Sequence, residues 1–146
     1  MTIAGILKHK AGAHEVVCVR PEDSVTEVVR VLNDKRIGAV LVQDASEQVV
    51  GILSERDIVR SLAANGAKTL DMSASQLMTR HIRTATPRTT VVEAMAMMTE
   101  GRFRHVPVLE DGRLVGLVSI GDVVKTRIRE QESEVDSLKA YVAGAA

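Results

Sequence analysis

The sequence predicts an α+β fold made of two tandem β-α-β-β-α repeats and an extended C-terminal helix. The first observation is a duplication: segments 50–59 and 115–124 carry apolar residues, glycine, serine and aspartate at equivalent places, 65 positions apart. The second is that each segment follows a helical pattern and then short apolar runs that a polar turn separates. Repeated units complete a core that neither closes alone. We therefore expect repeats at 1–66 and 67–126 and a helical extension at 127–146.

The first repeat contains every element of this pattern. Ser24 and Glu27 form a capping-box signature before a helix whose valines recur at helical spacing. Because valine is a poor helix former, packing must hold this helix. Ser54 is placed to cap a second helix, which Asn65-Gly66 ends. In chain order, we expect a helix at 3–10, strand 16–19, a helix from 25, strands 39–43 and 49–53, and a helix to about 64.

The second repeat shows the same order after a linker at 67–74. Residues 75–80 echo the N-terminal short helix, and a strand is expected from Ile82. Glu110-Asp111-Gly112 is a hairpin signal. Equivalent residues lie 66 apart before this turn and 65 apart after it, so the second turn is one residue shorter. The remaining elements are a helix over about 91–98, strands 106–109 and 114–118, and a helix opened by Ser119.

This last helix is expected to continue beyond the repeat, through about Tyr141 to Gly144. Its apolar residues form an incomplete stripe, and the rest of its surface is highly charged. The stripe consists of Val124, Ile128, Val135, Leu138 and Val142, with Gln131 interrupting it. Such a helix packs on a partner, for which a second copy of the chain is the leading candidate, or it folds back on its own domain.

Composition limits the possible functions. The chain has 146 residues, is 45% hydrophobic, and balances 19 basic against 19 acidic residues. A net charge of zero and the presence of one Phe and one Tyr argue against nucleic acid or an anionic membrane as partner. The single cysteine, the lack of a secretory pattern and the lack of a long apolar run predict a cytoplasmic protein.

A serine and an aspartate three residues apart are repeated at the strand-to-helix junction of each half. Ser54 and Ser119 stand where the helix N-terminus offers N–H groups and a positive dipole end, which favour phosphate. Asp57 and Asp122 lie one turn further, where a carboxylate could accept both hydroxyls of a ribose. The same spacing also makes a plain helix cap. The duplication favours two ligand sites over two caps.

The duplicated pattern resembles the cystathionine-β-synthase (CBS) domain, and two copies resemble a CBS pair, or Bateman module. The likeness rests on the G-h-h-S-x-x-D-h-h ending of both halves (h, apolar) and on Arg102-Phe103-Arg104-His105-Val106-Pro107-Val108, and it covers about residues 1–126. The resemblance implies repeats packed about a pseudo-twofold axis, two clefts between them, and a homodimer. The implied ligands are AMP, ADP, ATP, NAD(H) or S-adenosylmethionine.

The resemblance also implies further nucleotide-binding positions. Cys18 and Thr84 are equivalent residues that would border an adenine pocket, although core packing is the alternative for Cys18. Arg104 and His105 would face a cleft, and Gly38-Ala39 replace them in the first half, which removes charge but leaves room for close backbone approach. Arg36 and Arg56 are further candidates for phosphate, or else solvated surface charges; Gly121 takes the place of Arg56 in the second half. No redox role for Cys18 is supported, since no basic neighbour is evident.

Three classes of function follow. The leading one is a non-enzymatic regulatory module, an energy sensor that binds an adenosine nucleotide and signals occupancy to a regulated protein. Phosphate-bearing ligands are favoured over S-adenosylmethionine by Arg36, Arg104 and His105. The second is a structural or oligomerising module with empty clefts. The third, an enzyme, is disfavoured because the spacing shows no catalytic triad, glycine-rich phosphate loop or metal cluster. No catalytic cofactor is expected.

Overall fold

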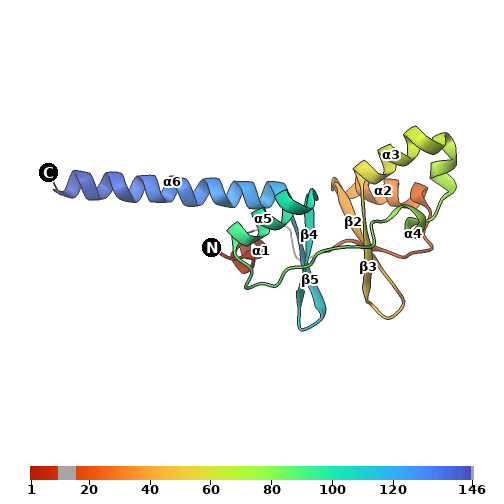
Figure 1. Ribbon diagram of the computed structural model, residues 1–146, viewed down its shortest axis with the longest axis horizontal. Coiled ribbons are helices and arrows are strands. Elements are labelled where there is room, and N and C mark those ends of the chain that lie inside the picture. Colours follow the sequence, from red (N-terminus) through yellow and green to blue (C-terminus); the bar gives the residue numbers. More distant parts are fainter. Residues whose placement is uncertain (10–15, 146) are drawn as a thin grey trace. The chain divides into compact units, whose positions relative to one another are not determined.

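The structure, a computed structural model, describes residues 1–9 and 16–145 of the chain. They form two compact units, which we treat separately. The central unit is the described chain between helix α1 (Ile3–His9) and Ile82, and the terminal unit comprises α1 together with the chain from Arg83 on (Figure 1). The fold is mixed α+β, as predicted, with a small sheet in each unit.

The central unit contains a three-stranded sheet in the order β1-β2-β3. Strand β1 is parallel to β2, and β3 is antiparallel to β2. Its strands are β1 (Cys18–Val19), β2 (Ala39–Gln43) and β3 (Val49–Ser54), and its helices are α2 (Val25–Lys35), α3 (Glu55–Asn65), the 3₁₀ helix η1 (Gly66–Asp71) and α4 (Ala74–Leu77). The valine-rich α2 is held by packing, because Val25 and Val28 are fully buried. Ser24 Oγ accepts the Glu27 N–H at 3.2 Å, which confirms the predicted cap.

The terminal unit repeats this order of elements, except that a single bridge residue, Ala85, stands in place of the strand β1. Its elements are α1 (Ile3–His9), α5 (Val91–Gly101), β4 (His105–Glu110), β5 (Arg113–Ser119) and α6 (Ile120–Ala145). The hairpin β4–β5 is antiparallel, as the Glu110-Asp111-Gly112 signal predicted. The strand expected from Ile82 is wrong: among the described residues, that segment makes a single parallel bridge, Ala85 to Val108.

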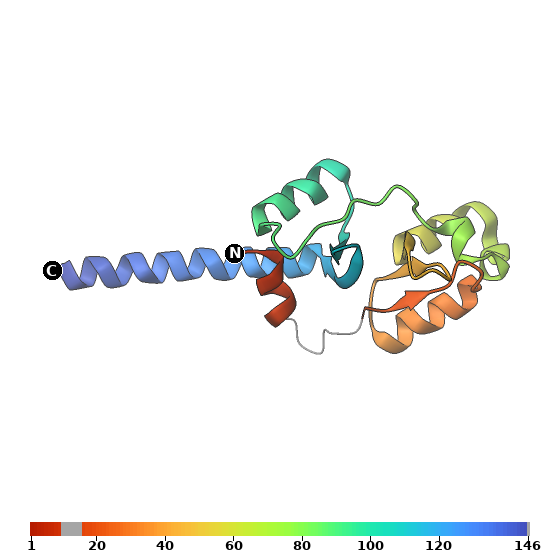
Figure 2. The same cartoon turned by 90° about the horizontal axis from the view of Figure 1, so that it is seen from below.

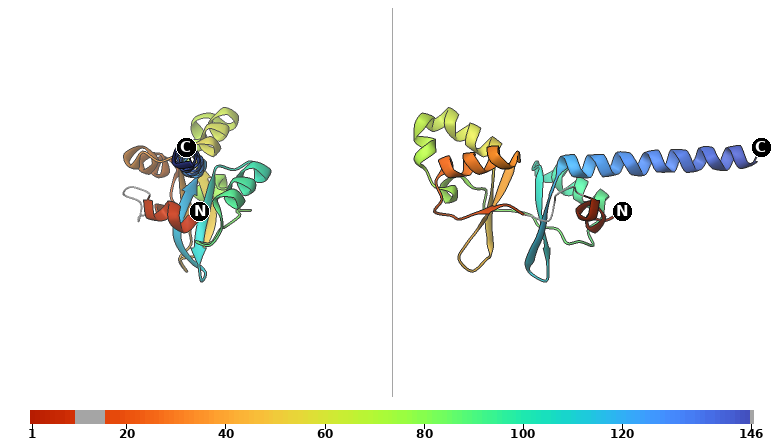
Figure 3. Two further views of the ribbon diagram at one scale, coloured as in Figure 1. Left: turned by 90° about the vertical axis from the view of Figure 1, so that its left-hand side faces the viewer. Right: turned by 180° about the vertical axis from the view of Figure 1, so that it is seen from behind.

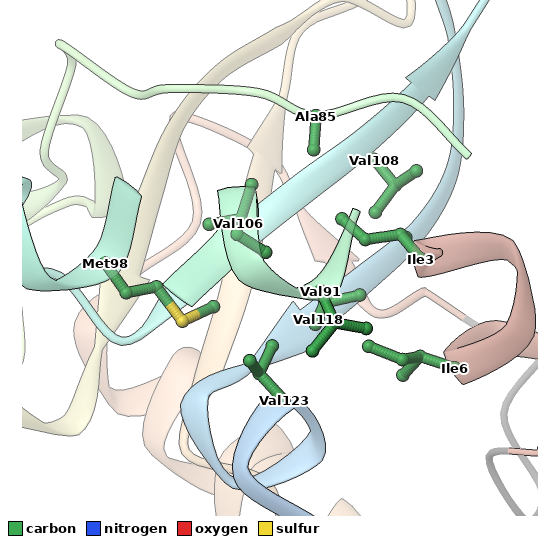
Figure 4. Packing of buried hydrophobic residues seen from close by; sticks show 10 residues of the cluster. Ile3, Ile6, Ala85, Val91, Met98, Val106, Val108, Val118 and Val123 are labelled. Atoms are coloured by element: carbon green, nitrogen blue, oxygen red, sulfur yellow. The ribbon is translucent and has the colours of Figure 1, made fainter. Parts of the chain in front are cut away.

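Two short helices exchange places between the repeats. Helix α1 lies at the start of the first repeat but belongs to the terminal unit, where Ile3 and Ile6 join the core around Val118 and Val123 (Figure 4). Helix α4 lies near the start of the second repeat but belongs to the central unit, whose core includes Ala74 and Met78. The compact units are therefore divided differently from the sequence repeats 1–66 and 67–126.

The glycine of the duplicated motif explains how these segments fit. A Cβ added at Gly51 would lie 2.5 Å from Met78 Sδ, and one added at Gly116 would lie 2.6 Å from Leu7 Cδ2. Each glycine thus permits the residues in or just after the short helix to approach the sheet closely. The segment expected to be a linker at 67–74 is also ordered: η1 contacts α2 and α3, and Thr69 is fully buried.

Candidate functional site

In the central unit, one end of the sheet gathers four of the predicted site residues. Ser54 ends β3 opposite Ala39, the first residue of β2. The Glu55 N–H donates to the Gly38 carbonyl at 2.9 Å, which ties the start of α3 to the start of β2. Cys18 pairs with Leu41, two residues further along β2. The parallel β1 and the antiparallel β3 therefore bring three distant parts of the sequence to one edge.

The terminal unit reproduces this edge. Ser119 ends β5 opposite His105, and the Ile120 N–H donates to the Arg104 carbonyl at 2.8 Å. Thr84 directly precedes the bridge residue Ala85 and is exposed. Each predicted residue of the second half thus occupies the place of its counterpart in the first. The two places are therefore structural copies, and we call them the Ser–Asp edges: the end of each sheet at which β3 or β5 leads into a helix.

The Ser–Asp motif forms a capping box in both units. The Asp57 N–H donates to Ser54 Oγ at 3.3 Å, while Asp57 Oδ2 accepts the Ser54 N–H at 2.9 Å and its hydroxyl at 3.0 Å. Asp122 and Ser119 make the corresponding backbone bonds at 2.9 and 3.2 Å. The helix-cap interpretation is therefore realised in the structure. Within the described chain, Asp57 Oδ1 makes no hydrogen bond, so this oxygen can accept a bond from a ligand.

The helix N-termini offer fewer N–H groups than the sequence led us to expect. The first amide of α3, at Glu55, is bonded to Gly38, and the third, at Asp57, is bonded to Ser54. Of the first three amides, this leaves the one at Arg56, which has no intramolecular acceptor in the part of the chain described. A phosphate at this edge would meet one amide and the dipole end rather than an open set of amides.

The basic candidates differ in placement. Arg36 is the C-cap of α2, adopts a left-handed conformation with φ of 54°, and is exposed. With Gly38, Glu55 and Val59, it lines an open groove of about 690 Å³ between α2 and α3. Arg56 and Arg104 are exposed, and His105 is half-buried. Arg36 lies on this groove, whereas Ser54 and Asp57 do not line it.

Cys18, the first residue of β1, is a half-buried free cysteine. Burial raises the pKa of its thiol above the usual range, and the positive charge of Arg20 offsets this only in part. The expectation that no basic neighbour is evident was wrong, since Arg20 is two residues away. The raised pKa nevertheless keeps the thiol protonated, which suits a small apolar lining group and not a nucleophile.

Sequence reasoning missed the backbone part of these edges. It assigned Gly38 and Arg104 to ligand contact, whereas the structure uses their carbonyls to anchor the first amide of α3 and α6. Their equivalent positions in the two repeats are the signal that could have revealed this shared role. Among the described residues, no cluster of His, Cys, Asp or Glu is placed to hold a metal. No described helix combines the length and apolar character needed to cross a bilayer.

Comparison with known proteins identifies the architecture. The family model named CBS domain matches residues 12–64 and 74–129. The mitochondrial CBS domain-containing protein CBSX3 of Arabidopsis thaliana is 34% identical over 98% of this chain and 72% of its own length. Two longer Arabidopsis CBS domain-containing proteins are matched over 22% of their lengths.

The solved structures to which the chain is similar are also CBS-domain proteins. A CBS-domain containing protein from Agrobacterium tumefaciens is 44% identical with a TM-score of 0.82, covering 86% of this chain and 92% of its own. The CBS domain pair of protein MJ0100, solved with 5′-methylthioadenosine and S-adenosyl-L-methionine, has a TM-score of 0.78 at 24% identity, covering 89% of this chain and 98% of its own. The chain belongs to the CBS domain family and carries two CBS domains in tandem.

Proposed function

We propose that this protein is a non-enzymatic regulatory module that binds adenosine nucleotides at its Ser–Asp edges and signals their presence to a partner protein. The candidate ligands are AMP, ADP, ATP and NAD(H). The observation that carries the proposal is the duplication of the edge: serine, aspartate and the start of a neighbouring strand recur at equivalent places in both units.

The chemistry of the edge suits a nucleoside. In the central unit, Asp57 Oδ2 is held by the cap, so the carboxylate is fixed in orientation while Oδ1 remains able to accept a ribose hydroxyl. Charge-assisted bonds of this kind contribute about 1.5–3 kcal/mol each. The protonated Cys18 thiol supplies an apolar wall for the base in a chain that has one Phe and one Tyr. The MJ0100 pair, whose ligands both contain adenosine, supports this ligand class.

Phosphate preference rests on the basic groups near each edge. In the central unit the exposed Arg56 follows the serine directly, and Gly121 stands at that place in the terminal unit. In the terminal unit His105 begins β4 opposite Ser119, and Arg104 directly precedes this strand. The two edges therefore carry positive charge on different elements. We propose that both take an adenosine phosphate and that they differ in the number of phosphates they favour.

The test uses Asp57→Asn and Asp122→Asn, because an amide oxygen retains the shape of the cap while the charge is lost. Ser24→Ala and Thr90→Ala are the matched controls: they remove the caps of α2 and α5 in the same units, away from the Ser–Asp edges. Thermal unfolding and calorimetric titration are measured with AMP, ADP, ATP, NAD, NADH and S-adenosylmethionine, each at about 1 mM. A ligand at about 100 times its Kd stabilises by about 2.7 kcal/mol, or about 5–10 °C.

Binding that the asparagine variants lose and the cap controls keep supports the proposal. Wild-type affinity in both asparagine variants overturns the site. If no ligand raises the melting temperature and the purified protein carries no nucleotide, the alternative of a ligand-free oligomerising module replaces it. A homodimer, a regulated protein partner and a cytoplasmic location remain predictions; the CBSX3 relative is named as mitochondrial.

A further inference from the structure

Helix α6 extends well beyond the core of the terminal unit. Val123 and Thr126 are buried in that unit, and Glu130 is the last residue of the helix that is not exposed (Figures 1 and 3). From Gln131 to Gly144 every residue is exposed, yet the helix runs without a break to Ala145. The alternative of a tail folded back on its own unit is therefore wrong, because the distal half of α6 makes no such contact within the described chain.

From Val124 onward, α6 carries a seam of partly exposed apolar residues at heptad spacing that continues into its exposed half. Steps of four and three residues alternate along it, which is the a/d pattern of a coiled coil. Its members are Val124 at 41% exposure, Ile128 at 49%, Gln131, Val135 at 49%, Leu138 at 63% and Val142 at 60%. With about 100° between successive residues, the seam lies roughly a quarter turn around the helix from buried Val123. The seam and the packed face are thus different surfaces of α6.

The residue types of the seam favour a coiled coil of two parallel helices. The a positions hold the β-branched residues Ile128, Val135 and Val142, and the d position 138 holds leucine. β-Branched residues at a with leucine at d favour a two-stranded parallel coiled coil. Gln131 is a single polar residue in the d series and interrupts the apolar seam.

Charges beside the seam fit a second copy of the same helix. In a parallel pair, a g residue faces the e residue five positions later on the other helix. Glu134 at g then faces Lys139 of the second copy, and Arg127 at g faces Glu132. Both pairings join opposite charges. Arg127 also pairs with Glu130 of its own helix at 3.1 Å, so Glu134 and Lys139 carry the argument. Glu134 and Lys139 are exposed, and neither makes an ion pair or side-chain hydrogen bond in the described structure.

An antiparallel pair would oppose like charges. Packing a residues against d residues of a reversed helix places Glu134 against Glu134 of the second copy, and Lys125 against Lys139. Like charges across a helix pair are destabilising. From the seam, its residue types and this complementarity, we infer that α6 pairs with α6 of a second copy as a parallel, in-register, two-stranded coiled coil. The inference does not rest on nucleotide binding.

Disulfide cross-linking of the full-length protein tests the orientation. In a Cys18→Ala background, Leu138→Cys places a thiol at a d position, and Ser133→Cys places one at the outward f position as the matched control. In the parallel pair, the two residues at 138 are adjacent and oxidation links the dimer. In the antiparallel pair they lie about ten residues, or 15 Å, apart along the axis, beyond disulfide reach. Linkage at 138 and not at 133 is expected; equal linkage at both, or none at 138, overturns the inference.

Charge reversal tests the pairing independently. Glu134→Lys and Lys139→Glu each create two repulsive contacts per dimer, so each should weaken the dimer about tenfold in analytical ultracentrifugation. The double variant restores opposite charges and should return to within about threefold of wild type. Ser133→Glu, on the outward face, should not change the dimer Kd. A wild-type chain that stays monomeric, or a double variant weaker than both single variants, contradicts the coiled coil.

Discussion

Replacing Gly51 with alanine tests whether the segment after α4 packs closely against β3, as the structure shows. The new Cβ would lie 2.5 Å from Met78 Sδ, 2.8 Å from Met78 Cγ and 2.9 Å from the backbone oxygen of Thr79. The Thr79 backbone cannot easily withdraw, because hydrogen bonds of 3.1 and 2.9 Å join it to Ile52 in both directions. Overpacking of this kind costs about 1–3 kcal/mol.

The equivalent Gly116→Ala is the matched control for the same substitution. The three atoms nearest its Cβ would all belong to the Leu7 side chain, Cδ2 at 2.6 Å, Cδ1 at 3.0 Å and Cγ at 3.3 Å, and this side chain can rotate away where a backbone oxygen cannot. At about 3 °C per kcal/mol for a chain of this size, Gly51→Ala should lower Tm by about 3–9 °C, and Gly116→Ala by clearly less. Both are measured by circular dichroism on the same preparation. Equal or reversed losses would refute the argument that backbone contact at Thr79 makes the difference.

Two titratable groups give further predictions. Because burial raises the pKa of the Cys18 thiol, a disulfide reagent at pH 7 should label native protein at least tenfold more slowly than urea-unfolded protein; equal rates would exclude the buried environment. Hydrogen bonds from the N-terminal ammonium and from Arg127 lower the pKa of Glu130 below its usual 4.5. The ionised Glu130 therefore adds to the free energy of unfolding above pH 4.5, and this stabilisation is lost as the pH falls through the lower pKa of the folded state. Urea titrations should show Glu130→Gln less stable than wild type by about 0.5–1 kcal/mol at pH 6, with the gap closing below pH 4; a constant gap would count against the ion pair.

Local patterns predicted most of the secondary structure. The caps at Ser24 and Ser54 and the hairpin at 110–112 follow from short-range chemistry, and all three are confirmed. The equivalent pairs Gln43–Val49 and Leu109–Leu114 enclose five and four residues, the one-residue difference that the change in spacing from 66 to 65 predicted. In the second hairpin a further pair, Glu110–Arg113, leaves two residues in the turn. The reduced strand near Ala85 and the helical segment 66–71 were missed. Both depend on contacts with distant residues, which local pattern does not encode.

The candidate site was predictable as a set of residues, and less so as geometry. The repeat indicated Ser54, Asp57 and their counterparts, and the structure brings each pair together with the start of a neighbouring strand. A carboxylate that accepts both hydroxyls of a ribose was expected, whereas Oδ2 of Asp57 is already bonded within the cap. A pattern of residue types does not distinguish a carboxylate that caps a helix from one that faces a ligand. Here the same carboxylate can do both, one oxygen for each.

The compact units, and not the sequence repeats, should be the parts of the chain that fold on their own. Figure 2 shows α1 beside the start of α6, and a hydrogen bond of 2.8 Å joins the Ile3 N–H to the Thr89 carbonyl. A fragment ending at residue 66 would lack Ala74 and Met78 from its core, and a small unit tolerates little such loss. Burying one methionine contributes about 1.5–3 kcal/mol.

Fragment 15–82, which follows the compact unit, should therefore unfold cooperatively in urea, while fragment 1–66, which follows the sequence repeat, should not. Met78→Ala in fragment 15–82 is the control that removes one core side chain and leaves the backbone contacts intact; it should lower the urea midpoint without abolishing the transition. Cooperative unfolding of 1–66 with a midpoint equal to that of 15–82 would show that the repeat, and not the exchanged unit, is what folds. The distinction matters for function, because variants at either Ser–Asp edge must be interpreted against the stability of a unit assembled from segments on both sides of a repeat boundary.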